Sequence, residues 1–545
     1  MKTLKGLLNQ ACTKRTINKA HAMSTALTKL RSICSQLDPS MVGPCKHIQL
    51  QLSHVPEHIS HGLKFVALEF ARVKYKVEAD NGPLFLMKIE SIGIMLILSQ
   101  FSNINTLVIC EEKYSFTPDM FKGPTRQNRQ SASTISSISH LIPESQIISE
   151  KSFDKAAVRE TVRGKKVAST YLAKHLDKLH LKKDLRLIVD SDLKVEGCAW
   201  SDKQNCKCPD KHSVTIHCFC SSEAGYVTGS KTDLAIKQRK GEGEMAIADW
   251  LLWHCLSGQL ADNESIAAIV SSGDIDAVVI TMFLVARHWP RFESGKFKNK
   301  VHVVLQKPNK LFDIYCISGI VEELESAYHT RDIALVVAVV LCIGGNDFLT
   351  GFRNRSHTKV LTIVLENEKL WKDLLVNDAT VALRRDKFVL LVKYLYSSKK
   401  LDAATSEYQT IRHHTISAKR TKRKSSLGVL VNDPESWLPP LSAIERLAEL
   451  VDFQLQYLLT TGYHNEQLPN IERCSCSVTL PNGSVAYDFG PDAHVTDINE
   501  LTPSTELASQ PQTSSRNKRS HVTPQKSRRK RPAHQSTPKQ ISRRH

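Results

Sequence analysis

The chain has 545 residues, of which 41% are hydrophobic and 6% aromatic, a composition typical of globular folding and long enough for two to four domains. Its fourteen cysteines are too dilute for a small disulfide scaffold and its N-terminus lacks a secretory signal, so we expect an intracellular protein. The longest apolar run, Ile333–Ile343, is about half of the roughly 20 residues that a spanning helix needs, so no membrane partner is expected.

The net charge of +19 is concentrated in two segments. Residues 516–545 contain eleven Lys or Arg and no acid, and residues 419–424 contain five more, which leaves about three net positive charges elsewhere. The tail, 501–545, is almost free of apolar residues and is predicted to be disordered. Its paired basic clusters are typical of a bipartite nuclear-import signal, which predicts a nuclear protein with an import receptor as a partner. The alternative is a solubilising tail that attracts phosphate non-specifically.

Short apolar, β-branched runs of the kind that form buried parallel strands recur along the chain. They cover residues 64–70, 106–112, 185–192, 265–276 and 301–306. Helix-like stretches lie between them, at 84–100, 153–183, 245–256, 320–328 and 333–343. This alternation predicts an α/β fold with a central, mainly parallel sheet flanked by helices. The clearest amphipathic helix covers 441–459.

Composition divides the chain into six segments. The strand and helix pattern predicts an α/β domain in two halves, interrupted by an insertion with Ser-rich, Lys-rich and Cys-rich stretches. The predicted segments are an N-terminal helical segment 1–60, the first half 61–130, the insertion 131–240, the second half 241–400, a C-terminal helical or irregular region 401–500 and the disordered tail 501–545.

Acidic residues follow several predicted strands, and two more open the predicted helix at 245–256. They are Glu69, Glu111, Glu242, Glu244, Asp274, Asp276 and Asp347. Ligand sites in open parallel sheets form outside the carboxyl ends of the strands, so these acids are expected to converge on one crevice. Asp274 and Asp276, two apart in extended chain, are expected to point to the same side. Any single acid could instead be a helix cap or a solvated loop residue.

Carboxylates packed into one pocket repel each other unless a cation neutralises them. Oxygen ligands at this density suit Mg²⁺ or Mn²⁺ rather than zinc. Two such ions form the arrangement that activates water and stabilises the leaving oxygen in phosphodiester cleavage. The spacing GExE, then SGDID, then GGND therefore indicates a two-metal site.

Three motifs, GEGEMAIADWL, SSGDIDAVVI and CIGGNDFLTGF, resemble in order and character the metal-binding motifs of the flap endonuclease/XPG family of structure-specific nucleases, a branch of the PIN-like fold. The resemblance covers roughly residues 60–130 and 240–350 and implies a PIN-like domain, with the insertion in the position of the family's arch. It also implies catalytic metal ligands at Glu242, Glu244, Asp274, Asp276 and Asp347.

The upstream block resembles the family with two departures. Glu69 and Glu111 stand where the family carries aspartate, and the resemblance makes both of them metal ligands. In the basic run that follows, it makes Lys122, Arg126 and Arg129 candidates for contacting the scissile phosphate. The longer glutamates shift the carboxylates by about one methylene, which matters because Mg²⁺ demands near-ideal octahedral geometry. The loop after Asp347 also lacks the glycine-rich hairpin that grips duplex DNA in the family.

These patterns predict a metal-dependent nuclease that hydrolyses phosphodiester bonds of DNA, or of RNA, by a two-metal mechanism. The alternative is a catalytically weakened PIN-like protein that binds nucleic acid without cutting it. A third hypothesis, a Mg²⁺-dependent phosphatase of another α/β fold, explains neither the order of the motifs nor the basic tail.

The Cys-rich stretch of the insertion contains two Cys-x-Cys pairs. Cys206, Cys208, Cys218 and Cys220 could ligate one structural zinc through four thiolates. Alternatively, residues 212–220 form a strand in which the last two cysteines share a buried face. A separate CSC sequence, Cys474 and Cys476, is expected to be structural or incidental.

Overall fold

The structure is a computed structural model, and all of its described residues belong to the first of the chain's two compact units, 1–496 and 497–545. Strands 50–52, 215–222 and 225–232 are described by their backbone only. The described residues are 23, 25–27, 50–52, 63–69, 77–101, 103–111, 142–179, 185–190, 215–222, 225–232, 242–258, 260–271, 276–306, 312–346, 349, 351–352, 355–377, 381–397, 401–422, 438–462, 469, 473–479 and 485–489. The predicted disordered tail, 501–545, lies outside them.

One nine-stranded sheet has the order β1-β9-β8-β7-β2-β3-β4-β5-β6. Its strands are β1 Leu50–Leu52, β2 Leu63–Glu69, β3 Thr106–Cys110, β4 Arg186–Asp190, β5 Thr215–Ser222, β6 Gly225–Thr232, β7 Ser265–Ser271, β8 Lys300–Gln306 and β9 Phe312–Cys316. The five central strands, from β8 to β4, are parallel, and antiparallel strands extend the sheet at both ends. The predicted mixed α/β architecture with a mainly parallel central sheet is confirmed.

The parallel strands follow a doubly wound order. Strand β2 lies at their centre, where Ala67 pairs with Val108 of β3 on one side and with Ala268 of β7 on the other. Numbered along the chain, the five strands have the order 3-2-1-4-5, so the order reverses between β2 and β7. In open α/β sheets, the crevice outside the carboxyl ends at such a switch point is where ligands bind.

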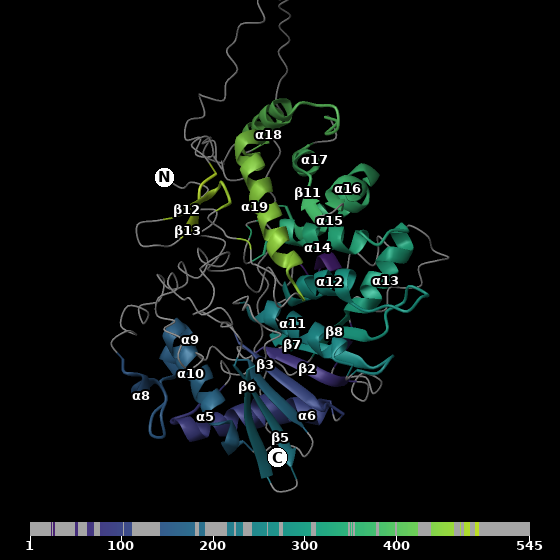
Figure 1. The fold of residues 1–545 in the computed structure, drawn as a ribbon. Coiled ribbons are helices and arrows are strands. Elements are labelled where there is room, and N and C mark those ends of the chain that lie inside the picture. The colour runs from purple at the N-terminus through teal and green to yellow at the C-terminus, as the bar shows by residue number, and fades with distance from the viewer. Residues whose placement is uncertain are drawn as a thin grey trace, which may run out of the picture. The chain divides into compact units, whose positions relative to one another are not determined.

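Helices flank the sheet and build a further helical region beyond it (Figure 1). They are α5 Gly82–Lys88, the π-helical η1 Ile89–Met95, α6 Leu96–Gln100, α8 Glu144–Ile147, α9 Lys155–Glu160, α10 Val162–Lys174, the 3₁₀ turn η2 Leu176–Lys178, α11 Gly243–Leu256, α12 Asp276–His288, α13 Ile317–Tyr328, α14 Ile333–Ile343, α15 His357–Leu365, α16 Glu368–Asp373, α17 Arg385–Tyr396, α18 Tyr408–Lys422 and α19 Leu441–Leu459. Two small antiparallel pairs complete the fold, β10 Leu375–Asn377 with β11 Val381–Leu383 and β12 Ser477–Thr479 with β13 Val485–Tyr487.

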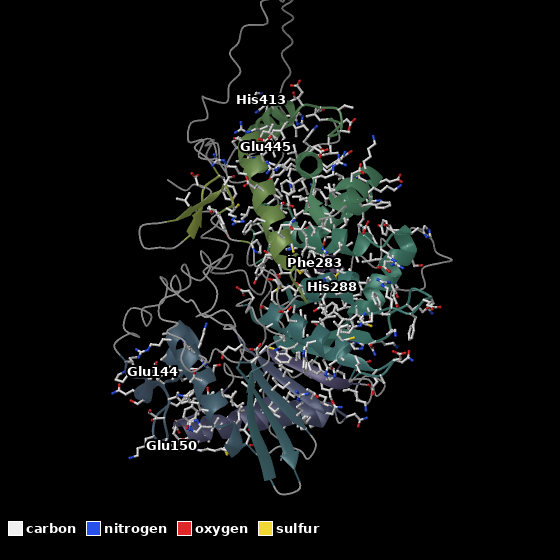
Figure 2. The ribbon with its side chains drawn as sticks, in the orientation of Figure 1. Glu144, Glu150, Phe283, His288, His413 and Glu445 are labelled. Atoms are coloured by element: carbon white, nitrogen blue, oxygen red, sulfur yellow. The ribbon has the colours of Figure 1, made fainter. Side chains whose placement is uncertain are left out.

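The two faces of the sheet carry separate hydrophobic cores, because successive strand residues point to opposite faces. On β2, Phe65 and Ala67 belong to the larger core with α11, α12 and α14, whereas Val66 and Leu68 belong to the smaller one with α5, α6 and α10. Figure 2 shows Phe283, from the middle of α12, within the larger core. Both faces of the parallel strands are therefore buried, which accounts for their nearly continuous apolar sequences.

Helix α14 is apolar on every side, and accordingly every residue from Ile333 to Ile343 is buried. Helices α12, α13, α15 and α16 pack around it. The apolar run that the sequence shows here is thus the centre of the larger core. Helix α19 covers residues 441–459, the range predicted for it, and packs against α12 and α17.

The continuous helical segment α5-η1-α6 is long and apolar enough to meet a membrane-span criterion, with a mean hydropathy of 1.6 over Gly82–Ser99. It packs on the sheet through side chains such as Phe85, Ile89 and Ile97, all of which are fully buried. Helices α13 and α14 meet the same criterion only when taken together, and they are bent by 110° at the break between them. Core helices of this composition meet the same criterion.

Two sequence-based expectations change in the structure. The run 265–276 was expected to be extended up to its acids, but β7 ends at Ser271 and Asp276 is the first residue of α12. The expectation that Asp274 and Asp276 share one side of an extended chain therefore does not hold for Asp276. In segment 131–240, β4 pairs in parallel with β3, so part of the predicted insertion belongs to the central sheet.

Candidate active site

Helix α11 runs antiparallel to the strands that it covers. Near its end, the His254 ring stacks on Phe65, close to the start of β2, with 4.2 Å between ring centroids. Nearer its middle, the Trp250 Nε1–H donates a 3.0 Å hydrogen bond to Oδ2 of Asp190, the last residue of β4. The helix therefore begins at the carboxyl edge of the sheet and ends towards its amino edge.

The first turn of α11 lies about level with the end of β2. Glu69 is four residues past Phe65, about 13 Å along the strand. Glu244 is ten residues before His254, about 15 Å along the helix. Because Phe65 and His254 are in contact, these similar lengths bring Glu244 and Glu69 to the same edge.

Glu242 and Glu244 can both point towards that edge because only the second of them has helical backbone angles. Glu242 is the N-cap residue, with extended backbone angles of φ −87° and ψ 132°, and Glu244 lies in the first helical turn. Both side chains are buried, at 6% and 8% exposed. Glu242 makes no side-chain capping hydrogen bond to its own helix, so capping does not explain why an acid stands there.

The SGDID and GGND motifs meet in one small pocket. Asp276, at the start of α12, and Asn346, which follows α14, both line it. The remaining lining side chains are apolar, Met23, Val279, Ile280, Cys342 and Leu458. Two motifs that are 70 residues apart in the chain therefore meet through Asp276 and Asn346, whereas the predicted ligands Asp274 and Asp347 lie outside the described residues.

The turn after α14 requires its two glycines. Gly345 has φ +111°, and a Cβ there would lie 2.7 Å from the backbone nitrogen of Gly351. A Cβ on Gly344 would lie 2.4 Å from the His357 ring, whose Nε2 is 2.7 Å from the Gly345 carbonyl oxygen. The Asn346 side chain accepts a 2.7 Å hydrogen bond from the Leu349 N–H. The tight turn thus fixes the backbone immediately before Asp347.

Two more acids lie at the carboxyl edge. Glu111 directly follows β3, is 3% exposed, and its N–H donates to the Asp190 carbonyl oxygen at 3.2 Å. Glu69 is the last residue of β2, and its side chain lies outside the described part of the chain. Asp190, 1% exposed, was missed by the sequence analysis, although the acid at the end of an apolar run is the signal that identified the others.

Several predicted site residues lie outside the described part of the chain. They are Asp274, Asp347, Lys122, Arg126, Arg129, Cys206 and Cys208. Cys218 and Cys220 lie on β5, in register with Ile188 and Arg186 of β4, but their side chains are not described. The strand expected at 212–220 is present from residue 215 onwards.

The described acids do not make a complete metal centre. Among the described residues, no three His, Cys, Asp or Glu side chains are placed to hold a metal ion. Asp276 and the turn before Asp347 are brought together, so a complete centre here would need the carboxylates of Asp274 and Asp347. Away from this edge, Cys474 and Cys476 are buried with their Sγ atoms 3.0 Å apart.

Two buried histidines lie away from the carboxyl edge and are held neutral. Burial lowers the pKa of His254 to about 4, with a smaller contribution from the Arg186 charge. Burial likewise lowers the pKa of His302, near the start of β8, to about 4. Neither ring has a hydrogen-bond partner among the described residues. We therefore assign both to the core and not to the site.

Comparison with known proteins identifies no family for this chain. No family model matches the sequence, and no curated protein matches it. The assignment of a function therefore depends on the residues and the geometry described above.

Proposed function

We propose that the chain is a metal-dependent nuclease with a PIN-like domain of the flap endonuclease/XPG type. The observation that carries the proposal is the pocket shared by Asp276 and Asn346, because it joins the second and third acidic motifs. The first motif supports it, since Glu242 and Glu244 begin α11 at the same edge of the sheet. The edge coincides with the topological switch point, where doubly wound sheets bind ligands.

The proposed reaction adds water across one P–O bond of a phosphodiester and leaves a phosphate monoester and a hydroxyl group. Glu242, Glu244, Asp274, Asp276 and Asp347 would hold two Mg²⁺ or Mn²⁺ ions, with Glu69 and Glu111 as further ligands. Such ions, when bound, lower the pKa of water and stabilise the leaving oxygen. The described carboxylates of this set are nearly buried, and their low exposure strengthens their attraction for cations; they are Glu111, Glu242, Glu244 and Asp276.

The proposed substrate is DNA in preference to RNA. Lys122, Arg126 and Arg129 would contact the scissile phosphate, and the basic tail would bind an import receptor and bring the protein to the nucleus. A structural zinc held by the two Cys-x-Cys pairs of segment 131–240 stays a prediction.

A nucleic-acid-binding protein without nuclease activity is the second candidate. It is favoured by the apolar side chains of Met23 and Leu458, which line the Asp276 pocket and leave little room for a hydrated ion. The glutamates in place of aspartates at positions 69 and 111 also favour this second candidate.

The test is cleavage of labelled 5′-flap DNA, single-stranded DNA and single-stranded RNA by the purified full-length chain in Mg²⁺ and in Mn²⁺. The double variant Asp274→Asn, Asp276→Asn should cut more than about 100-fold more slowly, because even residues that only support metal ligands are worth about 10- to 100-fold. Asp262→Asn is the matched control, since Asp262 is an exposed acid just before the amino end of β7. Binding without cutting, equal in wild type and double variant, would select the second candidate.

A further inference from the structure

Cys474 and Cys476 form a pair of buried thiols that the proposed nuclease does not use. The two residues are 2% and 0% exposed, and their Sγ atoms lie 3.0 Å apart. Apolar atoms pack best at about 3.5–4.0 Å, so the two sulfurs are closer than ordinary core packing would bring them. The pair therefore calls for an explanation other than two small hydrophobic side chains in a core.

Hydrogen bonds on both sides of the pair fix the turn that carries it. The Ser477 N–H donates to the Cys474 carbonyl oxygen at 2.9 Å. Between the two cysteines, the Ser475 N–H donates a 2.9 Å hydrogen bond to the Glu449 carboxylate on α19. Because the backbone is tied at these points, the turn holds the two sulfurs together.

A buried hydroxyl without a partner lies beside the two thiols. Tyr487 is paired across the β12-β13 hairpin with Ser477, the residue that directly follows Cys476. Burial, and then the charges of Cys476 and Cys474, raise the pKa of Tyr487. Its hydroxyl makes no hydrogen bond to a described residue. Buried hydroxyls normally have a partner, so this one indicates a place that accommodates one more polar atom next to the sulfurs.

A metal ion explains the pair less well than a disulfide does. Two thiolates on one zinc ion, with Zn–S bonds of about 2.3 Å, lie about 3.8 Å apart, and a structural zinc needs two further ligands. Among the described residues, no third His, Cys, Asp or Glu side chain is placed to complete such a site. A disulfide needs only the two sulfurs.

We propose that Cys474 and Cys476 are an oxidation site at which a peroxide converts the two thiols into one disulfide. First, the Cys474 thiolate attacks one oxygen of hydrogen peroxide and the O–O bond breaks. The sulfur becomes a sulfenic acid, and the other oxygen leaves as hydroxide and takes up a proton. Next, the Cys476 sulfur attacks the sulfenic sulfur, so that the S–S bond forms and the S–O bond breaks. The hydroxyl leaves with the thiol proton, and the sum is one disulfide and two water molecules.

The hydrogen bond between the two sulfurs sets the order of attack. Donation by the Cys476 thiol lowers the pKa of Cys474, and the same bond raises the pKa of Cys476. The thiolate is the nucleophile in this chemistry, so Cys474 reacts first. The Tyr487 hydroxyl, buried beside the pair, is then available to donate to the new sulfenic oxygen.

Access to the pair comes from opening of the β12-β13 hairpin. Each of its strands has only three residues, and Val478 is 43% exposed. A two-stranded pair is marginally stable by itself, and elements of low stability open locally while the core stays folded. Burial keeps the thiols unreactive in the closed state, so oxidation should be slower than that of an exposed thiol of the same pKa.

The experiment oxidises the reduced full-length chain with hydrogen peroxide. Catalase ends the reaction, the chain is unfolded, the remaining thiols are alkylated, and peptides are mapped by mass spectrometry. Cys474 and Cys476 should escape alkylation together, at least about 10-fold faster than Cys255, a buried thiol beside Asn299 whose pKa burial raises to about 11. The peptide should be lighter by two hydrogen atoms, and dithiothreitol should restore both thiols.

Two single variants test the order of attack. In Cys476→Ser, Cys474 should stop at the sulfenic acid, which dimedone labels. In Cys474→Ser, dimedone labelling of Cys476 should be at least about 10-fold weaker, because its thiolate is the less stable of the two. The peptide map of the wild type tests the disulfide even where a variant fails to fold.

Three results would overturn the inference. The pair could oxidise no faster than Cys255, or the map could join Cys474 to a different cysteine. Alkylation could also release zinc from the wild type but not from the Cys474→Ser, Cys476→Ser double variant, which would make the pair a metal site. The inference does not rest on the proposed function, because none of these assays contains nucleic acid.

Discussion

The two ends of the parallel strands differ in charge. At the amino edge, a cation and an acid form an ion pair, Lys64 Nζ and Glu264 Oε1 at 3.9 Å, and the Arg186 guanidinium lies 5.7 Å from the centre of the Trp253 ring. At the carboxyl edge, Glu111 and Asp276 are acids drawn from separate elements and both are buried. The two edges belong to the same strands, so strand composition does not explain the difference.

The largest expected effect is a difference in cutting rate between variants of two acids, Glu242 at the start of α11 and Asp249 within it. Glu242→Gln should slow cutting more than about 100-fold with little change in stability, because the variant keeps the side chain's size at the carboxyl edge. Asp249→Ala should do the reverse. Asp249 accepts a 2.7 Å hydrogen bond from the buried Gly462 N–H, and its loss should lower the free energy of unfolding by about 1–3 kcal/mol. Urea denaturation and cleavage assays on both variants measure this. A folded Asp249→Ala protein that does not cut would contradict the assignment of a purely structural role to Asp249.

The next effect concerns the glycine turn before Asp347. Gly345→Ala adds a Cβ at φ +111° and 2.7 Å from a backbone nitrogen, so it should lower the free energy of unfolding by more than about 2 kcal/mol and slow cutting. Gly295→Ala is the matched control, because its φ of +84° is unfavourable but the space around it is open. It should cost only about 1 kcal/mol. Equal losses for the two variants would show that the turn is not tightly packed in solution.

A smaller effect should appear on acidification. The pKa of His254 and of His302 is lowered to about 4 in the folded chain, whereas an unfolded histidine titrates near 6.5. The unfolded chain therefore binds more protons between these values, and stability is lost as the pH falls from about 6.5 towards 4. By pH 5 the loss should approach about 2 kcal/mol for each histidine. Urea denaturation at pH 7 and pH 5 measures it, and His254→Phe, which keeps a ring against Phe65, should reduce the dependence.

The smallest effect is expected at the amino edge. Lys64→Gln breaks a partly exposed ion pair with Glu264 and should change the free energy of unfolding by less than about 1 kcal/mol. Cutting should be unchanged. A marked loss of cutting in a stable Lys64→Gln protein would contradict the assignment of function to the opposite edge.

Short sequence patterns predicted those strands and helices that are determined by the residues within them. The β-branched run predicted at 106–112 forms a strand over Thr106–Cys110, the run at 301–306 lies within β8, and the amphipathic pattern at 441–459 forms α19 over its whole length. Asp276 and Asn346 of the GGND turn line one pocket, whereas the convergence predicted for Asp274 and Asp347 stays a prediction because both residues lie outside the described part of the chain.

The contacts of individual acids depend on residues that are far away in the sequence, and these contacts were not predicted. Asp190 accepts a hydrogen bond from a tryptophan 60 residues away, and Asp249 binds a backbone N–H 213 residues away. No spacing rule connects such residues, so these two hydrogen bonds could not be predicted from the sequence.

The central position of β2 has a consequence for how the chain is made. Leu63 of β2 pairs with Ser265 of β7, about 200 residues later in the chain. At about 5–20 residues per second, a ribosome needs roughly 10 to 40 s to make the intervening segment. During that time β2 can pair with β3, but its other hydrogen-bonding edge has no native partner, and such edges promote aggregation. The arrangement that brings acids from both halves of the chain to one edge thus leaves one hydrogen-bonding edge of β2 without its native partner until β7 has been synthesised.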